Sequence, residues 1–167
     1  MMNNAIWAEK YRPEVLEDFI CSDKVKLKFQ EYIDNQSIDH LLLYSPPGCG
    51  KTSLAKILTT SIECDVLYIK IKNFAMSMGN YDLKICILDE ADGLSIHAMQ
   101  ALRPIMEFTS SHTRFILTAN YPQKIIDPIK SRCQMFEFKS FSKKQVVKRL
   151  LDILGKDGIE YELEDVV

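Results

Sequence analysis

Short, unbroken apolar runs recur along the chain and alternate with stretches of a different period. Such runs are typical of strands that are buried on both faces of a parallel sheet. Between them, apolar residues are spaced three and four apart in 25–33, 54–62 and 98–106, which indicates helices. This alternation predicts an α/β fold with a doubly wound, parallel five-stranded sheet flanked by helices. The predicted strands are 41–44, 65–69, 85–88, 115–118 and 135–138.

Serine residues mark two of the predicted helix starts. Ser22 and Ser95 each precede a helical pattern and can cap it, because a serine hydroxyl accepts a hydrogen bond from a backbone N–H of the first turn. Further helices are expected from Thr52, across 74–78 and near Asp127.

The pattern changes after Ser142. An amphipathic helix is predicted over 143–154, and its polar face begins with basic residues. The stretch from Asp157 is acidic and ends inside an incomplete helix signal over 162–167. We expect residues 1–140 to form one domain and 141–167 to be the truncated start of a small helical domain.

The junction between Tyr68 and Asn73 lacks an ordinary connection. The letters Y-I-K-I-K-N pass from a strand into a helix without the short loop that normally joins such elements. We therefore expect that a segment is missing between residues 69 and 72.

Composition excludes several classes of protein. The chain has 167 residues, of which 47% are hydrophobic and 26% charged, with a net charge of -2. These values fit a globular protein and do not fit a wholly basic nucleic-acid binder. No apolar run reaches the roughly 18 residues that a membrane helix needs, and the first residues do not resemble a signal peptide. The five cysteines lack metal-site spacing, so we expect free thiols in a reducing cytosol.

The loop after the first predicted strand carries a phosphate-binding pattern. Its letters S-P-P-G-C-G-K-T end in glycines at 48 and 50, followed by Lys51 and Thr52. Lys51 is expected to reach the β- and γ-phosphates of a nucleotide, and the Thr52 hydroxyl to bind Mg²⁺. The strict motif has glycine where this chain has Ser45, a position that we expect to need an unusual backbone angle more than a contact.

Two acids follow the third predicted strand. Asp89 ends that strand and suits Mg²⁺, and Glu90 suits a general base that orients the attacking water. The letters D-E-A-D also occur in RNA helicases of the DEAD-box class, but those proteins place far more chain between the two motifs. Only 38 positions separate Lys51 from Asp89 here.

Two further residues have both a functional and a structural interpretation. Asn120 follows the fourth predicted strand, where it either holds the lytic water or simply starts a turn before Pro122. Arg132 follows a short helix, where it either acts in trans on a neighbour's γ-phosphate or is an ordinary surface arginine.

Taken together, these motifs resemble the ATPase subunits of sliding-clamp loaders. The resemblance includes the small subunit of replication factor C and its counterparts in tailed phages. It covers nearly the whole chain from Trp7 to Phe138, with the motifs in family order. They are W-A-E-K-Y-R-P at 7–13, the phosphate loop, D-E-A-D at 89–92, A-M-Q-A-L-R at 98–103 and S-R-C at 131–133.

The resemblance implies an AAA+ ATPase of the P-loop class that uses ATP and Mg²⁺. Such a protein opens a sliding clamp and loads it onto primer–template DNA, in a ring of subunits expected to be a pentamer, in the cytoplasm or nucleus. It also implies Glu90 as base, Asn120 as sensor, Arg132 in trans and Thr52 with Asp89 at the metal, while Gln100 would couple DNA contact to Glu90. The implied nucleotide contacts are Tyr11, Arg12, Pro13, Pro47, Gly48, Cys49, Gly50, Lys51, Thr52 and Ser53.

One departure from the family pattern concerns the helix after the acidic box. Pro104 stands where the family commonly has a second arginine, and an interior proline should kink that helix.

Several rival functions stay open. They are a helicase loader or branch-migration motor, a P-loop small-molecule kinase, and a loader subunit that binds nucleotide without hydrolysing it.

Overall fold

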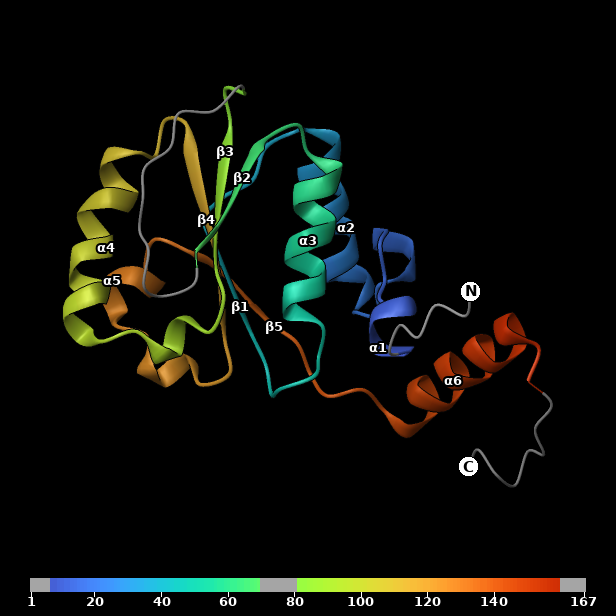
Figure 1. Ribbon diagram of the computed structural model, residues 1–167. Helices are drawn as coiled ribbons and strands as arrows, with labels where there is room; N and C mark the ends of the chain where they lie inside the picture. The colour runs from blue at the N-terminus through green and yellow to red at the C-terminus, as the bar shows by residue number, and fades with distance from the viewer. Residues whose placement is uncertain (1–6, 70–80, 160–167) are drawn as a thin grey trace, which may run out of the picture. The chain divides into compact units, whose positions relative to one another are not determined.

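The computed structural model describes residues 7–69 and 81–159 (Figure 1). Within these residues the strands form one parallel sheet in the order β2-β3-β4-β1-β5. Their positions agree with the predicted strands to within two residues, and most side chains of the three central strands, β3, β4 and β1, are buried. The strands are β1 (Leu41–Tyr44), β2 (Asp65–Ile69), β3 (Lys84–Leu88), β4 (Thr113–Ala119) and β5 (Gln134–Glu137).

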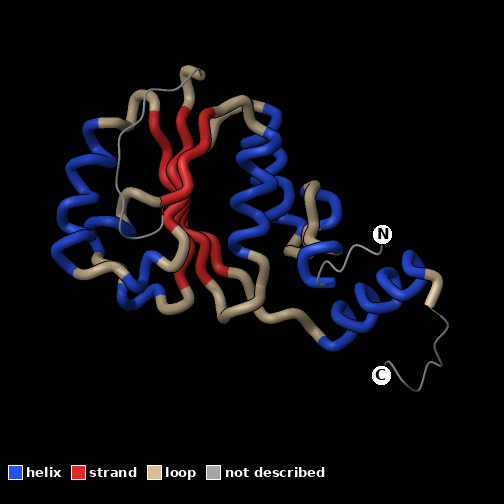
Figure 2. The backbone as a smooth tube through the Cα atoms, viewed as in Figure 1, coloured by secondary structure: helices blue, strands red, loops and turns tan. Residues whose placement is uncertain are grey.

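Helices cover both faces of the sheet and make three layers (Figure 2). On one face, α2 (Asp23–Asp34) and α3 (Lys51–Ser61) enclose an apolar core that includes Phe29, Leu54 and Leu58. On the other face, α4 (Ile96–Phe108) and α5 (Asp127–Lys130) enclose a second core with Met99, Met106 and Phe115. The predicted doubly wound arrangement is thus confirmed.

Short 3₁₀ helices join several of these elements. They are η1 (Leu16–Asp18), η2 (Ala91–Gly93) and η3 (Pro122–Lys124). Pro104 lies inside α4, which continues as one helix from Ile96 to Phe108. The helix expected over 74–78, the signal over 162–167 and most of the suspected gap between 69 and 72 lie outside the described residues.

The chain divides into two compact units. The larger is Pro13–Phe138, which contains the sheet and its flanking helices. The smaller joins the described residues up to Arg12 with those from Lys139 on, and holds α1 (Trp7–Lys10) and α6 (Lys143–Asp157). The sequence-based expectation placed residues 1–140 in one domain. The structure instead groups the N-terminal segment with α6.

Contacts inside the smaller unit account for that grouping. Both Lys10 and Tyr11 donate side-chain hydrogen bonds to Asp157, and Arg149 donates from Nη2 to the Tyr11 carbonyl at 2.9 Å. The ion pair with Lys10 and the hydroxyl of Tyr11 hold the pKa of Asp157 below its usual value. Among the described residues, no helix combines the length and the apolar character needed to cross a bilayer.

Candidate nucleotide-binding site

The loop between β1 and α3 has the backbone of a phosphate cradle. Gly48 and Gly50 have φ angles of +80° and +85°, in the left-handed region that favours glycine. A Cβ on Gly50 would also lie 2.8 Å from Cε2 of Phe19, so the loop packs tightly against the segment that precedes α2. Because α3 begins directly at Lys51, its first N–H groups face the space that an anion would fill.

Lys51 is buried and its ammonium group is surrounded by oxygens. Its Nζ donates to Asn120 Oδ1 at 2.8 Å, to the carbonyl and hydroxyl of Ser45 at 3.0 Å each, and to the Pro46 carbonyl at 3.2 Å. Burial lowers the pKa of Lys51, and nearby acids including Asp89 oppose that change. Ser45 and Asn120 lie close together because they directly follow Tyr44 and Ala119, which are paired in the parallel strands β1 and β4.

Ser45 differs from its sequence interpretation. Its φ is not positive, since Gln36 and Glu90 are the only non-glycine residues with positive φ in the part of the chain that the structure describes. Its backbone N–H donates to the Ala119 carbonyl at 3.2 Å, and its buried side chain contacts Lys51. The expectation of an unusual angle was therefore wrong: Ser45 contributes a contact.

Thr52 and Asp89, the two residues predicted to bind Mg²⁺, meet at the same edge of the sheet. The Thr52 hydroxyl lies 3.0 Å from Oδ1 and 3.2 Å from Oδ2 of Asp89. The hydroxyl of Thr118 also donates to Asp89. Sequence analysis missed Thr118, although a threonine inside an otherwise apolar strand is a signal that could have been used.

Glu90 turns away from the end of β3 with an unusual backbone. Its φ of +54° is in the left-handed region, which non-glycine residues adopt at a cost and often at functional sites. Its N–H donates to the Thr118 hydroxyl at 3.0 Å, and its side chain is exposed. This geometry leaves the carboxylate of Glu90 accessible to solvent.

The last acid of the D-E-A-D segment holds the turn after β4. Oδ2 of Asp92 accepts from the N–H groups of Asn120 at 3.3 Å and of Tyr121 at 3.1 Å. Oδ1 of Asp92 is buried and has no hydrogen-bond partner among the described residues. Asp92 therefore positions Asn120, a role that sequence analysis did not assign.

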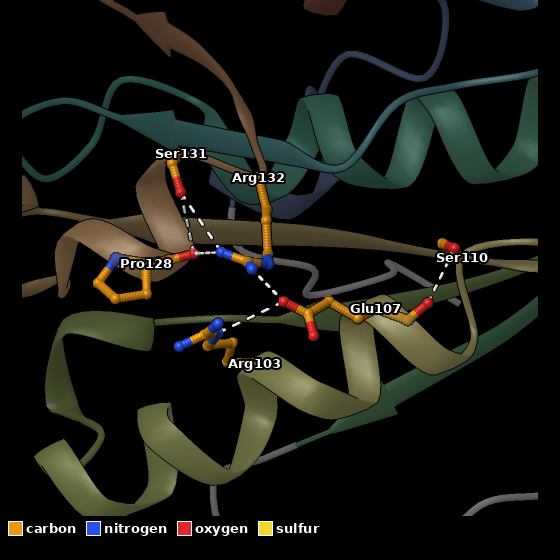
Figure 3. Close-up of polar contacts among 6 residues, drawn as sticks. All are labelled: Arg103, Glu107, Ser110, Pro128, Ser131 and Arg132. Carbon is orange, nitrogen blue, oxygen red and sulfur yellow. Dashed lines mark hydrogen bonds and ion pairs between the residues drawn. The ribbon is translucent and has the colours of Figure 1, made fainter.

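Arg132 lies apart from the contacts of Lys51. It contacts α5 and α4: Nη1 donates to the Pro128 carbonyl at 2.6 Å, and Nη2 forms an ion pair with Glu107 (Figure 3). Gln100 is exposed on α4 and lines a small cleft of about 290 Å³ with Arg103, Ile126 and Pro128. No contact joins Gln100 to Glu90 within the described residues, so its coupling role stays a prediction.

The remaining predicted residues are divided between the two compact units. Tyr11 and Arg12 belong to the smaller unit, where Arg12 pairs with Glu9, and Pro13 begins the larger unit. Their role near an adenine stays a prediction. Pro47, Cys49 and Ser53 belong to the loop and the start of α3, where Cys49 is buried.

The larger unit fits a nucleotide with Mg²⁺. The left-handed glycines and the start of α3 can bind phosphates, and Lys51 can add a positive charge. Mg²⁺ takes one or two protein oxygens and completes its shell with phosphates and water, which suits Thr52 with Asp89. The described residues contain no cluster of three or more histidine, cysteine or acidic side chains that could hold a metal without a nucleotide.

Curated relatives confirm the resemblance of the sequence to clamp-loader subunits. A replication factor C small subunit from Aeropyrum pernix is 40% identical over an alignment 179 positions long, which covers 95% of this chain and 55% of that protein. The counterpart from Halobacterium salinarum is 41% identical and covers 93% of this chain and 54% of that protein. This chain spans about half the length of the curated relatives that it matches.

Solved structures show the same fold. A variant of Thermotoga maritima RuvB superposes with a TM-score of 0.76 at 20% identity, covering 90% of this chain and 56% of that one. A structure described as the RuvB Holliday junction branch migration motor has a TM-score of 0.65 at 21% identity. The family model of ATPases associated with various cellular activities (AAA) matches residues 41–141, from β1 through β5. The loop, the acidic box and this match lead to one conclusion: the chain belongs to the AAA family of ATPases.

Proposed function

We propose that this protein is an ATPase subunit of a sliding-clamp loader. The observation that carries the proposal is the convergence of Lys51 with Asn120 and of Thr52 with Asp89 at one sheet edge, in a chain similar to replication factor C small subunits. The subunit would use ATP binding and hydrolysis to open a clamp and load it onto primer–template DNA in replication, in the cytoplasm or the nucleus.

Each residue of the site has a defined role in this proposal. Lys51 exchanges its contacts with Ser45 and Pro46 for the β- and γ-phosphates, because an ammonium group is attracted more strongly to them than to neutral carbonyls. Thr52 and Asp89 hold Mg²⁺. Glu90 accepts a proton from the attacking water, and Asn120 orients that water.

The proposal includes a ring of subunits, expected to be a pentamer. The contacts of Arg132 are with α4 and α5 rather than with the loop of its own subunit, which supports donation of Arg132 to a neighbouring site. An arginine supplied in trans stabilises the charge of the transferring phosphoryl group. The box at Tyr11, Arg12 and Pro13 would lie near the adenine.

The proposal also includes a segment missing between residues 69 and 72. The match to the Aeropyrum relative is 179 residues long, whereas this chain has 167. That alignment must therefore contain residues of the relative that have no counterpart here, which supports an internal gap.

The test of the clamp-loader function is ATP turnover by the full-length protein. We expect turnover to rise when primer–template DNA and the cognate clamp are both added, because loading couples hydrolysis to these partners. Turnover that responds to neither addition would contradict the clamp-loader role. A response to branched DNA alone would favour a branch-migration motor, and phosphate transfer to a small molecule would favour a kinase.

A second experiment tests the catalytic assignment. The substitution Glu90→Gln keeps the shape of the side chain and removes its basicity, so ATP should still bind while turnover falls by about 100-fold or more. Thr60→Ser is the control for effects of expression and purification, because Thr60 lies on α3 and its hydroxyl donates to carbonyls within that helix. The turnover of this variant should equal that of the parent. Turnover that survives Glu90→Gln would refute the role of Glu90 as the base.

A further inference from the structure

Glu107 connects two arginines near the C-terminal end of α4. Its Oε1 accepts from Nη2 of Arg132 and, at 3.4 Å, from Nε of Arg103 one helical turn earlier (Figure 3). Arg132 comes from the segment after α5, so the contact joins two elements that are 25 positions apart in the sequence. Sequence analysis singled out Arg132 but did not assign Glu107.

The guanidinium of Arg132 is held through both of its terminal nitrogens. Nη1 donates to the Pro128 carbonyl at 2.6 Å and to the Ser131 hydroxyl at 3.4 Å, while Nη2 pairs with Glu107. The side chain of Arg132 is 26% exposed. Its Nε has no acceptor among the described residues, and Nη2 carries a second hydrogen. Two fixed points orient a planar guanidinium, and the Nε–Nη2 edge is the pair of donors that a phosphate accepts in bidentate fashion.

The negative charge of Glu107 does not cancel the positive charges of Arg103 and Arg132. Both guanidinium groups stay charged at neutral pH, so two positive charges face one carboxylate. The ion pair with Arg132 lowers the pKa of Glu107, which is therefore ionised at neutral pH. The cluster keeps a net positive charge and can still attract a phosphate.

We infer that Glu107 is a positioning residue for Arg132: it holds the guanidinium against α4 in the orientation that meets the γ-phosphate of a neighbouring subunit. The inference rests on the proposed trans role of Arg132. Exposed ion pairs contribute little to stability, so the expected effect of Glu107 is on orientation rather than on folding. An arginine left to rotate must first be ordered in the transition state, which slows hydrolysis.

The experiment is a double-mutant cycle in the full chain, assembled with the other subunits of its ring. Four proteins are compared: the parent, Glu107→Ala, Arg132→Ala and the double variant. Glu107→Ala should lower kcat for ATP by about three- to tenfold with KM changed by less than about twofold, because the arginine acts on charge that develops in the transition state. In the Arg132→Ala background, Glu107→Ala should have no further effect, since residues that act through one another are not additive.

A matched control separates positioning from a general loss of surface charge. Glu31 is an exposed carboxylate on α2, paired with Lys28 at 3.0 Å, so Glu31→Ala removes a similar ion pair away from Arg132. Glu31→Ala should leave kcat unchanged. The thermal unfolding midpoints of the two single glutamate variants should both stay close to that of the parent.

The outcomes distinguish this inference from the proposed function. If Arg132→Ala lowers turnover but Glu107→Ala has no effect, or has the same effect in both backgrounds, Glu107 does not act through Arg132. If Arg132→Ala itself leaves turnover unchanged, the trans role in the proposed function fails, and the role of Glu107 fails with it.

Discussion

At the scale of single residues, Lys51 shows how the loop after β1 accommodates a buried positive charge. A buried ammonium group is costly unless its hydrogens find acceptors. Lys51 has three N–H hydrogens and four oxygens within hydrogen-bond distance, from Ser45, Pro46 and Asn120. Each N–H hydrogen of Lys51 therefore has an acceptor, and one acceptor is in excess. Three of the four acceptors belong to Ser45 and Pro46, in the loop where phosphates would bind.

This excess of acceptors gives a prediction for Ser45. Ser45→Ala deletes Oγ and still leaves three acceptors for the three hydrogens, so the ATP dissociation constant should stay within about threefold of the parent. Ser45→Gly deletes the same atom and should behave in the same way, because the backbone at residue 45 has no positive φ. Isothermal titration of ATP into each variant measures this.

Lys51→Ala is the reference for this comparison and should weaken ATP binding by tenfold or more, since it removes a charge-assisted contact with phosphate. Tighter binding by Ser45→Gly but not by Ser45→Ala would restore the interpretation of residue 45 as a position that needs a glycine backbone.

At the scale of elements, the pairing of strands determines which residues meet. The registers of β1 with β4 and of β3 with β4 bring the ends of these strands to a common edge. Asn120 then lies beside the phosphate loop, and Thr118 beside Asp89. The central strands β1, β3 and β4 could be predicted, because burial on both faces requires apolar runs that are visible in the sequence.

The contacts between elements could not be predicted in the same way. The role of Ser45 as a partner of Lys51, the support of Asn120 by Asp92 and the pairing of Glu107 with Arg132 all depend on strand order and helix placement. Those are properties of tertiary packing and leave no local pattern. Thr52 and Asp89, both predicted to bind Mg²⁺, lie within hydrogen-bond distance of each other, and their metal role stays a prediction.

Helix starts provide a prediction at this scale. Ser142 and Ser22 both occupy N-cap positions with extended backbone, but only Ser142 makes a capping box, with its Oγ 3.3 Å from the Gln145 N–H. Ser142→Ala should destabilise the first turn of α6 by about 1 kcal/mol, whereas Ser22→Ala should change α2 by only a few tenths. Amide hydrogen exchange in the first turn of each helix measures both effects. Equal changes at the two helices would contradict the difference in capping.

At the scale of the whole molecule, the proposed function requires a second subunit to complete the ATP site. Lys51, Thr52, Asp89 and Glu90 can bind and activate ATP within one chain, while the positively charged Arg132 is held by α4 and α5 away from the contacts of Lys51. In the proposed function, the residues that bind ATP are thus separate from the arginine that would accelerate its hydrolysis. Binding should therefore occur in isolated subunits, and rapid turnover should not.

Dilution tests this separation. ATP turnover per subunit should fall steeply when the protein is diluted below the concentration at which its ring assembles, because each site then loses the arginine of its neighbour. ATP binding, followed with a fluorescent nucleotide, should change little over the same range. The Arg132→Ala protein provides the control: its low turnover should be independent of concentration, since assembly adds no arginine. Turnover per subunit that stays constant on dilution of the parent to monomers, verified by light scattering, would mean that one chain contains the whole catalytic site.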